Sequence, residues 1–278
     1  MTTHTPLTGK LLDYEYEIDV ADEALREHLR AVLLDSLTHV EAPATFEITE
    51  VGGDHFALAA GGEVVDKSIA SRAIVAKLLW ILNRRSTERR PGSPGEHEVM
   101  IHAGAVEHDG TGVLMVGSSG SGKTTASIGA ALHGFRFLTD DIVAVDRSGV
   151  VRGSRKPVGL RRGAMAALGV PEPDTSSKFS KGTSLPIAAT SLGIGFGQTA
   201  PVGVVIFPEQ HGPAGEFRSI SRANALQRLT ANCFDPVPLA DPDFRALARL
   251  VQEAWTFEWT HGPLRDFADT LRGFLHRH

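Results

Sequence analysis

Residues 117–124 combine glycines, small polar residues, a lysine and a threonine in the pattern G-x-x-x-x-G-K-[ST]. Glycines let the backbone curl so that several N–H groups point at one anion. A lysine ammonium can then reach phosphate oxygens, and the threonine hydroxyl can bind Mg²⁺. The residues expected to surround the phosphates are Gly117, Ser118, Ser119, Gly120, Ser121, Gly122, Lys123, Thr124 and Thr125.

The segments on either side of this loop also suit a phosphate site. Residues 112–116 form a short apolar run that is typical of a buried strand, and residues 124–132 are mostly good helix formers. The loop would therefore lie at a helix N-terminus, where anions are favoured. The alternative is a Gly/Ser-rich surface loop, which is disfavoured because the flanking strand and helix match the motif as well.

Asp140 and Asp141 are the second candidate feature, since they lie between two apolar runs that predict strands, residues 135–138 and 142–146. Two carboxylates between strands are costly to bury without partners, and a Mg²⁺–nucleotide would supply them. Adjacent side chains on an extended backbone point to opposite faces, so the two residues are expected to have different roles. The alternative is a solvated turn, because Asp is a common turn residue.

Residues 101–125 together with residues 138–143 resemble the HPr serine kinase family. That family has a histidine-bearing strand, a hairpin, the phosphate loop, a short helix and then an Asp-Asp pair. The resemblance covers about residues 98–146 well; the rest is more weakly similar to a looser group of HPr-kinase-like proteins that includes lasso-peptide precursor kinases. It implies an α/β fold, with a P-loop kinase core of HPr-kinase/phosphoenolpyruvate-carboxykinase type and a small N-terminal α/β region.

The resemblance implies ATP and Mg²⁺ as cofactors and gives roles to individual residues. Lys123 would bind phosphate, Asp140 would be the general base, and His102 would lie near the transferred phosphoryl group. Thr124 and Asp141 would bind the metal. The exchanged assignment of the two aspartates is the alternative, because strand ends often carry bulges that re-aim side chains.

The chain departs from the family at two places. Thr125 stands where bacterial HPr kinases carry a glutamate, and residues 151–155 lack the glutamate of the family's later Glu-Arg-Gly signature. The resemblance therefore does not extend to a second Mg²⁺ ligand, to the reverse phosphorylase activity or to HPr as the acceptor.

Basic residues after the Asp pair are candidates for contacts with phosphate or substrate. Phosphoryl transfer needs cations near the charge that develops on the oxygens. The densest basic cluster spans residues 152–162, where Pro157 and Gly159 predict an irregular backbone, and a polar loop at residues 176–184 adds two lysines. The candidates are Lys156, Arg161, Arg162 and Lys181. The alternative for each of them is a solvated surface residue.

The composition indicates an ordinary globular protein. Of the 278 residues, 42% are hydrophobic and 22% are charged, and the net charge of −5 argues against general nucleic-acid binding. The apolar stretches are shorter than a membrane span, and the first ten residues show no secretion-signal pattern. The single cysteine, Cys233, excludes an internal disulfide and leads us to expect a cytoplasmic location.

A polar segment rich in Arg, Pro and Gly at residues 84–98 predicts a linker or a long loop. It would separate an N-terminal α/β region, residues 1–90, from an ATP-binding catalytic domain, residues 98–278. No catalytic pattern occurs before the linker. We therefore expect the N-terminal region to pack on the catalytic domain or to recognise a substrate.

Apolar spacing predicts the main elements on both sides of the linker. In the N-terminal region we expect a helix over residues 21–37, strands between residues 45 and 66, and a helix capped by Ser68. In the C-terminal region we expect strands at 202–207 and 255–259 and helices at 221–232, 243–253 and 263–275.

These features lead us to expect a cytoplasmic, ATP-dependent phosphotransferase with an alcohol group as acceptor. The expected acceptor is a serine-type hydroxyl of a peptide or small protein. Two alternatives stay open: a kinase for a small hydroxy compound such as a free hydroxy amino acid, and an ATPase switch without an acceptor. No nucleic-acid or membrane partner is expected, and homo-oligomerisation is left open.

Overall fold

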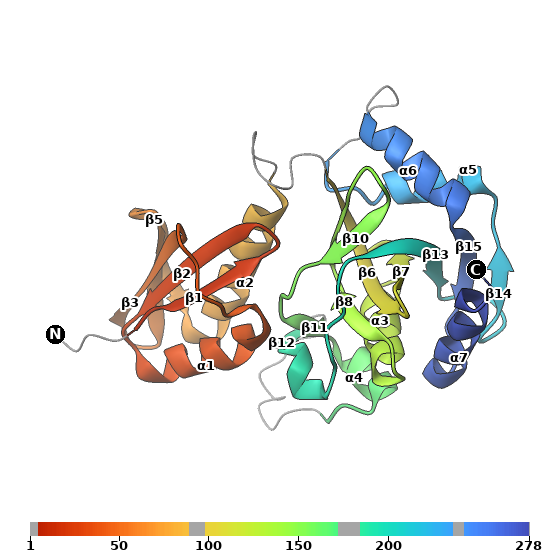
Figure 1. The fold of residues 1–278 in the computed structure, drawn as a ribbon. Helices are drawn as coiled ribbons and strands as arrows, with labels where there is room; N and C mark the ends of the chain where they lie inside the picture. The colour runs from red at the N-terminus through yellow and green to blue at the C-terminus, as the bar shows by residue number, and fades with distance from the viewer. Residues whose placement is uncertain (1–4, 89–97, 172–183, 236–241, 278) are drawn as a thin grey trace. The chain divides into compact units, whose positions relative to one another are not determined.

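The computed structural model describes residues 5–88, 98–171, 184–235 and 242–277, and it is a mixed α/β protein. Its internal contacts divide the chain into two compact units (Figure 1). The units are Met1–Ser93 with Arg155–Pro157 and Pro186–Ala188, and Pro94–Ser154 with Val158–Leu185 and Ala189–His278.

The first unit is built on a five-stranded sheet with the order β1-β2-β3-β4-β5. Neighbouring strands are antiparallel, except that β2 and β3 are parallel. The strands are Leu7–Leu11 (β1), Tyr14–Val20 (β2), Ala44–Gly52 (β3), His55–Ala60 (β4) and Glu63–Ala70 (β5). The helices are Glu23–Leu33 (α1), the short 3-10 helix Leu34–Ser36 (η1) and Ser71–Thr87 (α2).

One face of this sheet is buried against α1 and α2. Alternate residues of β2 are buried, as the two-residue period of a strand requires. The buried side chains of both helices belong to the same hydrophobic cluster as those of the strands. The first unit therefore has a core of its own.

Three expectations for this unit are corrected by the structure. Residues 7–20, for which no element is predicted, form β1 and β2. Ser68 lies in β5, because pairing with β4 continues to Ala70, and the helix begins only at Ser71. Residues 84–87 belong to the last turn of α2, where arginines are favourable beside the helix C-terminus, and residues 89–97 lie outside the described residues.

The second unit contains an eight-stranded sheet with the order β10-β9-β6-β7-β13-β15-β14, and β8 also pairs with β6. Its strands are Val99–His108 (β6), Thr111–Val116 (β7), Arg136–Thr139 (β8), Ile142–Val145 (β9), Val150–Gly153 (β10), Ala200–Glu209 (β13), Phe217–Ser219 (β14) and Trp255–Thr260 (β15). Its helices are Lys123–Leu132 (α3), Arg162–Leu168 (α4), Arg222–Thr230 (α5), Pro242–Glu253 (α6) and Leu264–Leu275 (α7). The short segments Val158–Leu160 (β11), Leu185–Ile187 (β12) and the 3-10 helix Ala189–Leu192 (η3) complete the described elements.

Helices cover both faces of this sheet. Buried residues of α5 and α6 share one hydrophobic cluster with alternate residues of β6, β7 and β13. On the other face, α3 contacts β6 and β7, and α7 contacts α3 and β13. Figure 1 shows α5 and α6 on one side of the strands and α3 and α7 on the other. The strand and helix predictions for residues 202–275 are confirmed, whereas the irregular backbone predicted around Pro157 and Gly159 is wrong at β11.

Three strands of this sheet end at the same edge. β13 is parallel to both β7 and β15, so the segments that follow the three strands leave the sheet together. Residues 117–122 follow β7, Gln210 follows β13 and His261 follows β15. In α/β sheets, ligands bind outside the carboxyl ends of parallel strands. This edge is therefore where a functional site is expected.

Candidate functional site

The glycine-rich loop connects β7 directly to α3, as the motif predicts. Gly120 and Gly122 have φ angles of +87° and +101°, in the left-handed region that glycine adopts without strain. Gly122 is the residue immediately before the first residue of α3, Lys123. The loop thus places the N-terminus of a ten-residue helix at the sheet edge, where backbone N–H groups and the helix dipole favour anions.

Close packing inside the loop requires glycine at two of the motif positions. A Cβ atom at Gly117 would lie 2.7 Å from Oγ of Ser121, and one at Gly122 would collide with the His261 ring. His261 contacts the loop through Nε2, which lies 2.8 Å from the carbonyl oxygen of Ser121. Among the described residues, no hydrogen-bond partner is found for the buried Ser121 Oγ. The loop is therefore held from the β15 side.

Lys123 folds its ammonium group back onto the loop. Nζ donates hydrogen bonds to the carbonyl oxygens of Gly117, at 2.6 Å, and Ser118, at 3.0 Å. An ammonium has three N–H donors, so these two bonds leave one for a ligand. Burial lowers the pKa of Lys123 to about 8, while the nearby carboxylates of Asp141 and Asp140 oppose this shift and Arg161 adds to it.

The lowered pKa of Lys123 predicts that nucleotide affinity depends on pH. Only the charged ammonium attracts phosphate, so the affinity should be full below pH 8 and should fall as the pH rises through that value. By proton linkage we expect about a tenfold loss between about pH 7 and about pH 9. Calorimetry with ATP at saturating Mg²⁺ measures this loss. Lys123→Met, which has no titrating group, should bind weakly and equally at both pH values.

Asp140 and Thr124 form one polar pair beside the loop. The Thr124 hydroxyl donates a hydrogen bond of 3.1 Å to Oδ2 of Asp140. Asp140 is only 4% exposed, so a large phosphate acceptor such as a peptide cannot reach its side chain. Both groups supply oxygen atoms, the donors that Mg²⁺ prefers.

Asp141 pairs with His102 instead. Nδ1 of His102 lies 2.8 Å from Oδ1 of Asp141, and the two side chains remain 32% and 28% exposed. The backbone holds this pair in place, since Ala103 N donates to the Asp141 carbonyl and His102 N donates to the Asn232 carbonyl. The two adjacent carboxylates therefore have different partners, and only Asp141 has substantial access to solvent.

The basic candidates are distributed unevenly. Nη2 of Arg161 lies 3.3 Å from Oγ of Ser119, which places this exposed guanidinium at the loop. Arg162 is the exposed first residue of α4. Lys156 is buried in a piece of chain that falls with the first unit, and its Nζ donates to the Pro157 carbonyl. Lys181 lies outside the described residues.

Two loop contacts were not predicted from the sequence. The side-chain amide of Gln210 donates a 2.7 Å hydrogen bond to the carbonyl oxygen of Gly120, and His261 contacts Ser121 as described above. Both residues come within three positions of the end of a predicted strand, 202–207 for Gln210 and 255–259 for His261. Once β13 and β15 are known to be parallel to β7, the residues after these strands become candidates, but the sequence alone does not give that pairing.

Two kinds of feature are absent from the described residues. No group of three or more His, Cys, Asp or Glu side chains there could hold a metal ion. None of the helices in that part of the chain is long and apolar enough to cross a membrane.

Comparisons with known proteins give limited information. No protein-family model matches the chain, and no curated protein matches it. One solved structure with which it aligns is the Hpr(Ser) kinase/phosphatase from Coxiella burnetii, at 12% sequence identity and a TM-score of 0.31. The alignment covers 64% of this chain and 95% of that one. Similarity at this level carries no inference about activity, which has to be argued from the site itself.

Proposed function

We propose that this protein is a phosphotransferase that passes the γ-phosphoryl group of Mg²⁺–ATP to an alcohol hydroxyl. The observation that carries the proposal is the position of the loop at residues 117–122. The loop connects the carboxyl end of the parallel strand β7 to the N-terminus of α3, and Lys123 and the two aspartates lie beside it. This combination provides both cations and N–H groups for phosphate and carboxylates for metal and proton.

The phosphates are held by the loop amides, by the N-terminus of α3 and by Lys123. Binding of the triphosphate would draw the ammonium from the Gly117 and Ser118 carbonyls toward the anionic oxygens. Arg161, which reaches Ser119, is placed to offset the charge that develops on the phosphoryl oxygens. Arg162 and Lys156 remain candidates for contacts with phosphate or substrate, as does Lys181, which lies outside the described residues.

Thr124 and Asp140 fit a Mg²⁺ ion that arrives with the nucleotide. Such an ion usually takes one or two protein oxygen groups and completes its shell with phosphate oxygens and water. This pair supplies a hydroxyl and a carboxylate that already lie 3.1 Å apart. When bound, Mg²⁺ neutralises part of the negative charge of the β- and γ-phosphates.

Asp141 is proposed as the general base, which exchanges the roles that the resemblance implied for the two aspartates. A base has to reach the acceptor hydroxyl, and Asp141 is accessible whereas Asp140 is buried beside Thr124. An N–H of His102 Nδ1 would orient the Asp141 carboxylate. The hydroxyl oxygen bonds to the γ-phosphorus, its proton passes to Asp141, the bond from the γ-phosphorus to the bridging oxygen breaks, and ADP leaves.

The proposed acceptor is a serine-type hydroxyl on a peptide or small protein. The test offers γ-labelled ATP and Mg²⁺ with a panel of serine-containing peptides, free hydroxy amino acids or no acceptor. Label on a peptide supports the proposal, and label only on a free amino acid would replace the peptide by a small molecule. Release of inorganic phosphate at the same rate with and without every acceptor would indicate an ATPase and contradict a phosphotransferase.

Removal of divalent ions is expected to weaken ATP binding by at least about tenfold, because the phosphates would then lie near the carboxylates of Asp140 and Asp141 without the metal charge between them. Calorimetry in a chelator, followed by addition of Mg²⁺ or Mn²⁺, measures the loss and its recovery. Equal ATP affinity with and without metal would argue against the roles of Thr124 and Asp140.

A further inference from the structure

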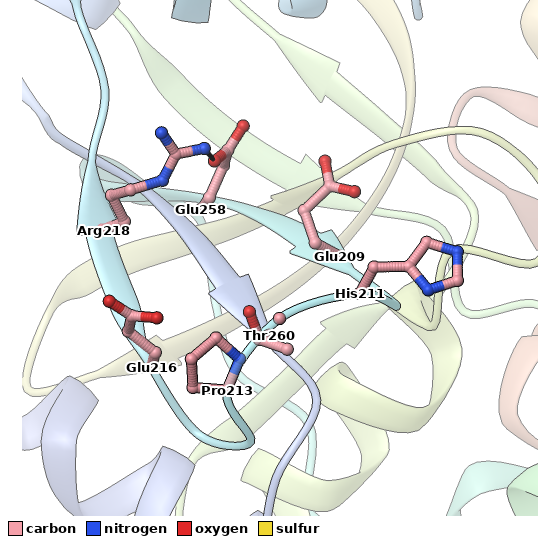
Figure 2. Close-up of a pocket in the computed structure, with 8 residues that line it drawn as sticks. Glu209, His211, Pro213, Glu216, Arg218, Glu258 and Thr260 are labelled. Atoms are coloured by element: carbon pink, nitrogen blue, oxygen red, sulfur yellow. Dashed lines mark hydrogen bonds and ion pairs between the residues drawn. The ribbon is translucent and has the colours of Figure 1, made fainter.

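A hollow of about 440 Å³ opens in the second unit beside the loop, within the size range of sites for small molecules. It lies where β13 and β15 end, as Figure 2 shows. The residues that line it are Glu209, His211, Gly212, Pro213, Glu216, Arg218, Glu258 and Thr260.

The backbone around this hollow is fixed by hydrogen bonds between the strand ends. Gly215 N donates to the Thr260 carbonyl, Thr260 N donates to the Glu216 carbonyl, and His261 N donates to the Glu209 carbonyl. Gly262 packs so closely on Gly215 that a Cβ there would lie 2.6 Å from the Gly215 backbone. The backbone that surrounds the hollow is therefore fixed by hydrogen bonds and close packing at the edge of the sheet.

The lining is rich in carboxylates, which accept hydrogen bonds, and has fewer positively charged groups. Arg228 of α5 is not among the lining residues, but it pairs with two of them, Glu209 at 2.5 Å and Glu258 at 2.7 Å. Glu258 also pairs with the lining residue Arg218. The three lining carboxylates are those of Glu209, Glu216 and Glu258, and the two guanidinium groups are those of Arg218 and Arg228. Together these five side chains carry a net charge of −1. Such a lining disfavours an anion and suits an uncharged group that donates hydrogen bonds, such as a hydroxyl-bearing sugar.

The hollow is next to the phosphate loop in the chain and in space. Gln210, which contacts Gly120, lies between the lining residues Glu209 and His211, and His261, which contacts Ser121, follows the lining residue Thr260. In the sheet order, β13 and β15 lie on one side of β7, whereas β6 and β9 lie on the other. His102 lies on β6, and the Asp pair immediately precedes β9. The hollow and the proposed metal thus lie on opposite sides of the loop.

We propose that this hollow binds the nucleoside end of the triphosphate, with Glu209 accepting a hydrogen bond from a ribose hydroxyl. The inference rests on the proposed function, because the γ-phosphate must point toward the Asp pair for transfer. The nucleoside is attached at the other end of the triphosphate, so it leaves the loop on the β13 and β15 side. There it meets acceptors suited to a sugar and no excess of cations that would compete for the phosphates.

The test compares Glu209→Gln with wild type by calorimetry in Mg²⁺, using three probes: ATP, the dideoxy analogue of ATP that lacks both ribose hydroxyls, and inorganic tripolyphosphate. Glu253→Gln is the matched control, because Glu253 also loses one ion pair, with Arg249, on the exposed surface of α6. Wild type should bind ATP at least about tenfold more tightly than the dideoxy analogue and tripolyphosphate. Glu209→Gln should lose about tenfold in ATP affinity and most of the preference for ATP over the dideoxy analogue, and should keep its tripolyphosphate affinity.

Other results would contradict either the nucleoside site or the proposed function. Equal affinity of wild type for all three probes, or unchanged ATP affinity in Glu209→Gln, would overturn the nucleoside site and leave the phosphate loop standing. A change in the KM for a peptide acceptor with no change in ATP affinity would make the hollow an acceptor site and also overturn it. Absence of binding by both ATP and tripolyphosphate to wild type would instead remove the proposed function, and this inference with it.

Discussion

Lys123→Ala should lower phosphoryl transfer by at least about 100-fold, because the variant loses a cation that contacts the phosphates as charge develops on them. Removal of one such preorganised group raises the barrier by about 3 kcal/mol. The ammonium is placed for this role by its two bonds to the Gly117 and Ser118 carbonyls, which hold it inside the loop. Turnover of γ-labelled ATP by the purified variant measures the effect.

The same substitution should leave the fold intact. Burial lowers the pKa of Lys123 in the folded state to about 8, below the ordinary value of 10.5. Below pH 8 the lysine is charged in both states, and burying that charge lowers the stability of the folded protein. This loss of stability becomes smaller as the pH rises from 8 toward 10.5. Removal of the lysine at neutral pH should therefore not lower the melting temperature. Lys77→Ala, at a half-buried lysine of α2 in the first unit, is the control for turnover. Wild-type turnover in a folded Lys123→Ala variant would contradict the role of the loop.

Asn in place of Asp141 is expected to leave Mg²⁺–ATP binding nearly intact and to reduce transfer by about 100-fold or more, because an amide cannot accept the hydroxyl proton. Asn in place of Asp140 should instead weaken metal-dependent nucleotide binding, since it removes a charge beside Thr124. Calorimetry with Mg²⁺–ATP and acceptor-dependent turnover of both variants separate the two roles. Asp269→Asn, on the exposed surface of α7, controls for the loss of one carboxylate.

Two other results would change this assignment. If Asp140→Asn keeps nucleotide affinity and loses transfer while Asp141→Asn loses affinity, the roles implied by the family resemblance hold. If both variants bind and transfer normally, the pair is only a turn, and His102 becomes the next candidate for the base. A His102→Gln variant tests that candidate, because glutamine can form a hydrogen bond but cannot take up the proton.

The local geometry of the site could be predicted because its signals are local. The phosphate-loop motif fixes a strand, a turn rich in glycine and a helix within about twenty residues, and the structure has them in that order. The two strands around Asp140 and Asp141 are also in place, but both residues lie in the bend between β8 and β9, so strand alternation does not account for their different partners. Which of the two residues is exposed could not be predicted, because it depends on α3 and β6 packing around them.

Contacts between distant strands could not be read from the sequence. Gln210 and His261 reach the loop only because β13 and β15 run parallel to β7, and these strands lie far along the chain. Ser68 is a good local helix cap, yet pairing with β4 extends β5 past it. Tyr14–Val20 is a different case, because its alternation of apolar and acidic residues is a strand signal that was present in the sequence.

A crystal structure with Mg²⁺ and a non-hydrolysable ATP analogue tests the central claim most directly. We expect the β- and γ-phosphates among the N–H groups of residues 117–124, with Lys123 on the phosphates and Thr124 and Asp140 at the metal. Asp141 and His102 should face the open side of the γ-phosphate. A nucleotide bound at another place, or a loop without nucleotide at saturating analogue concentration, would contradict the account.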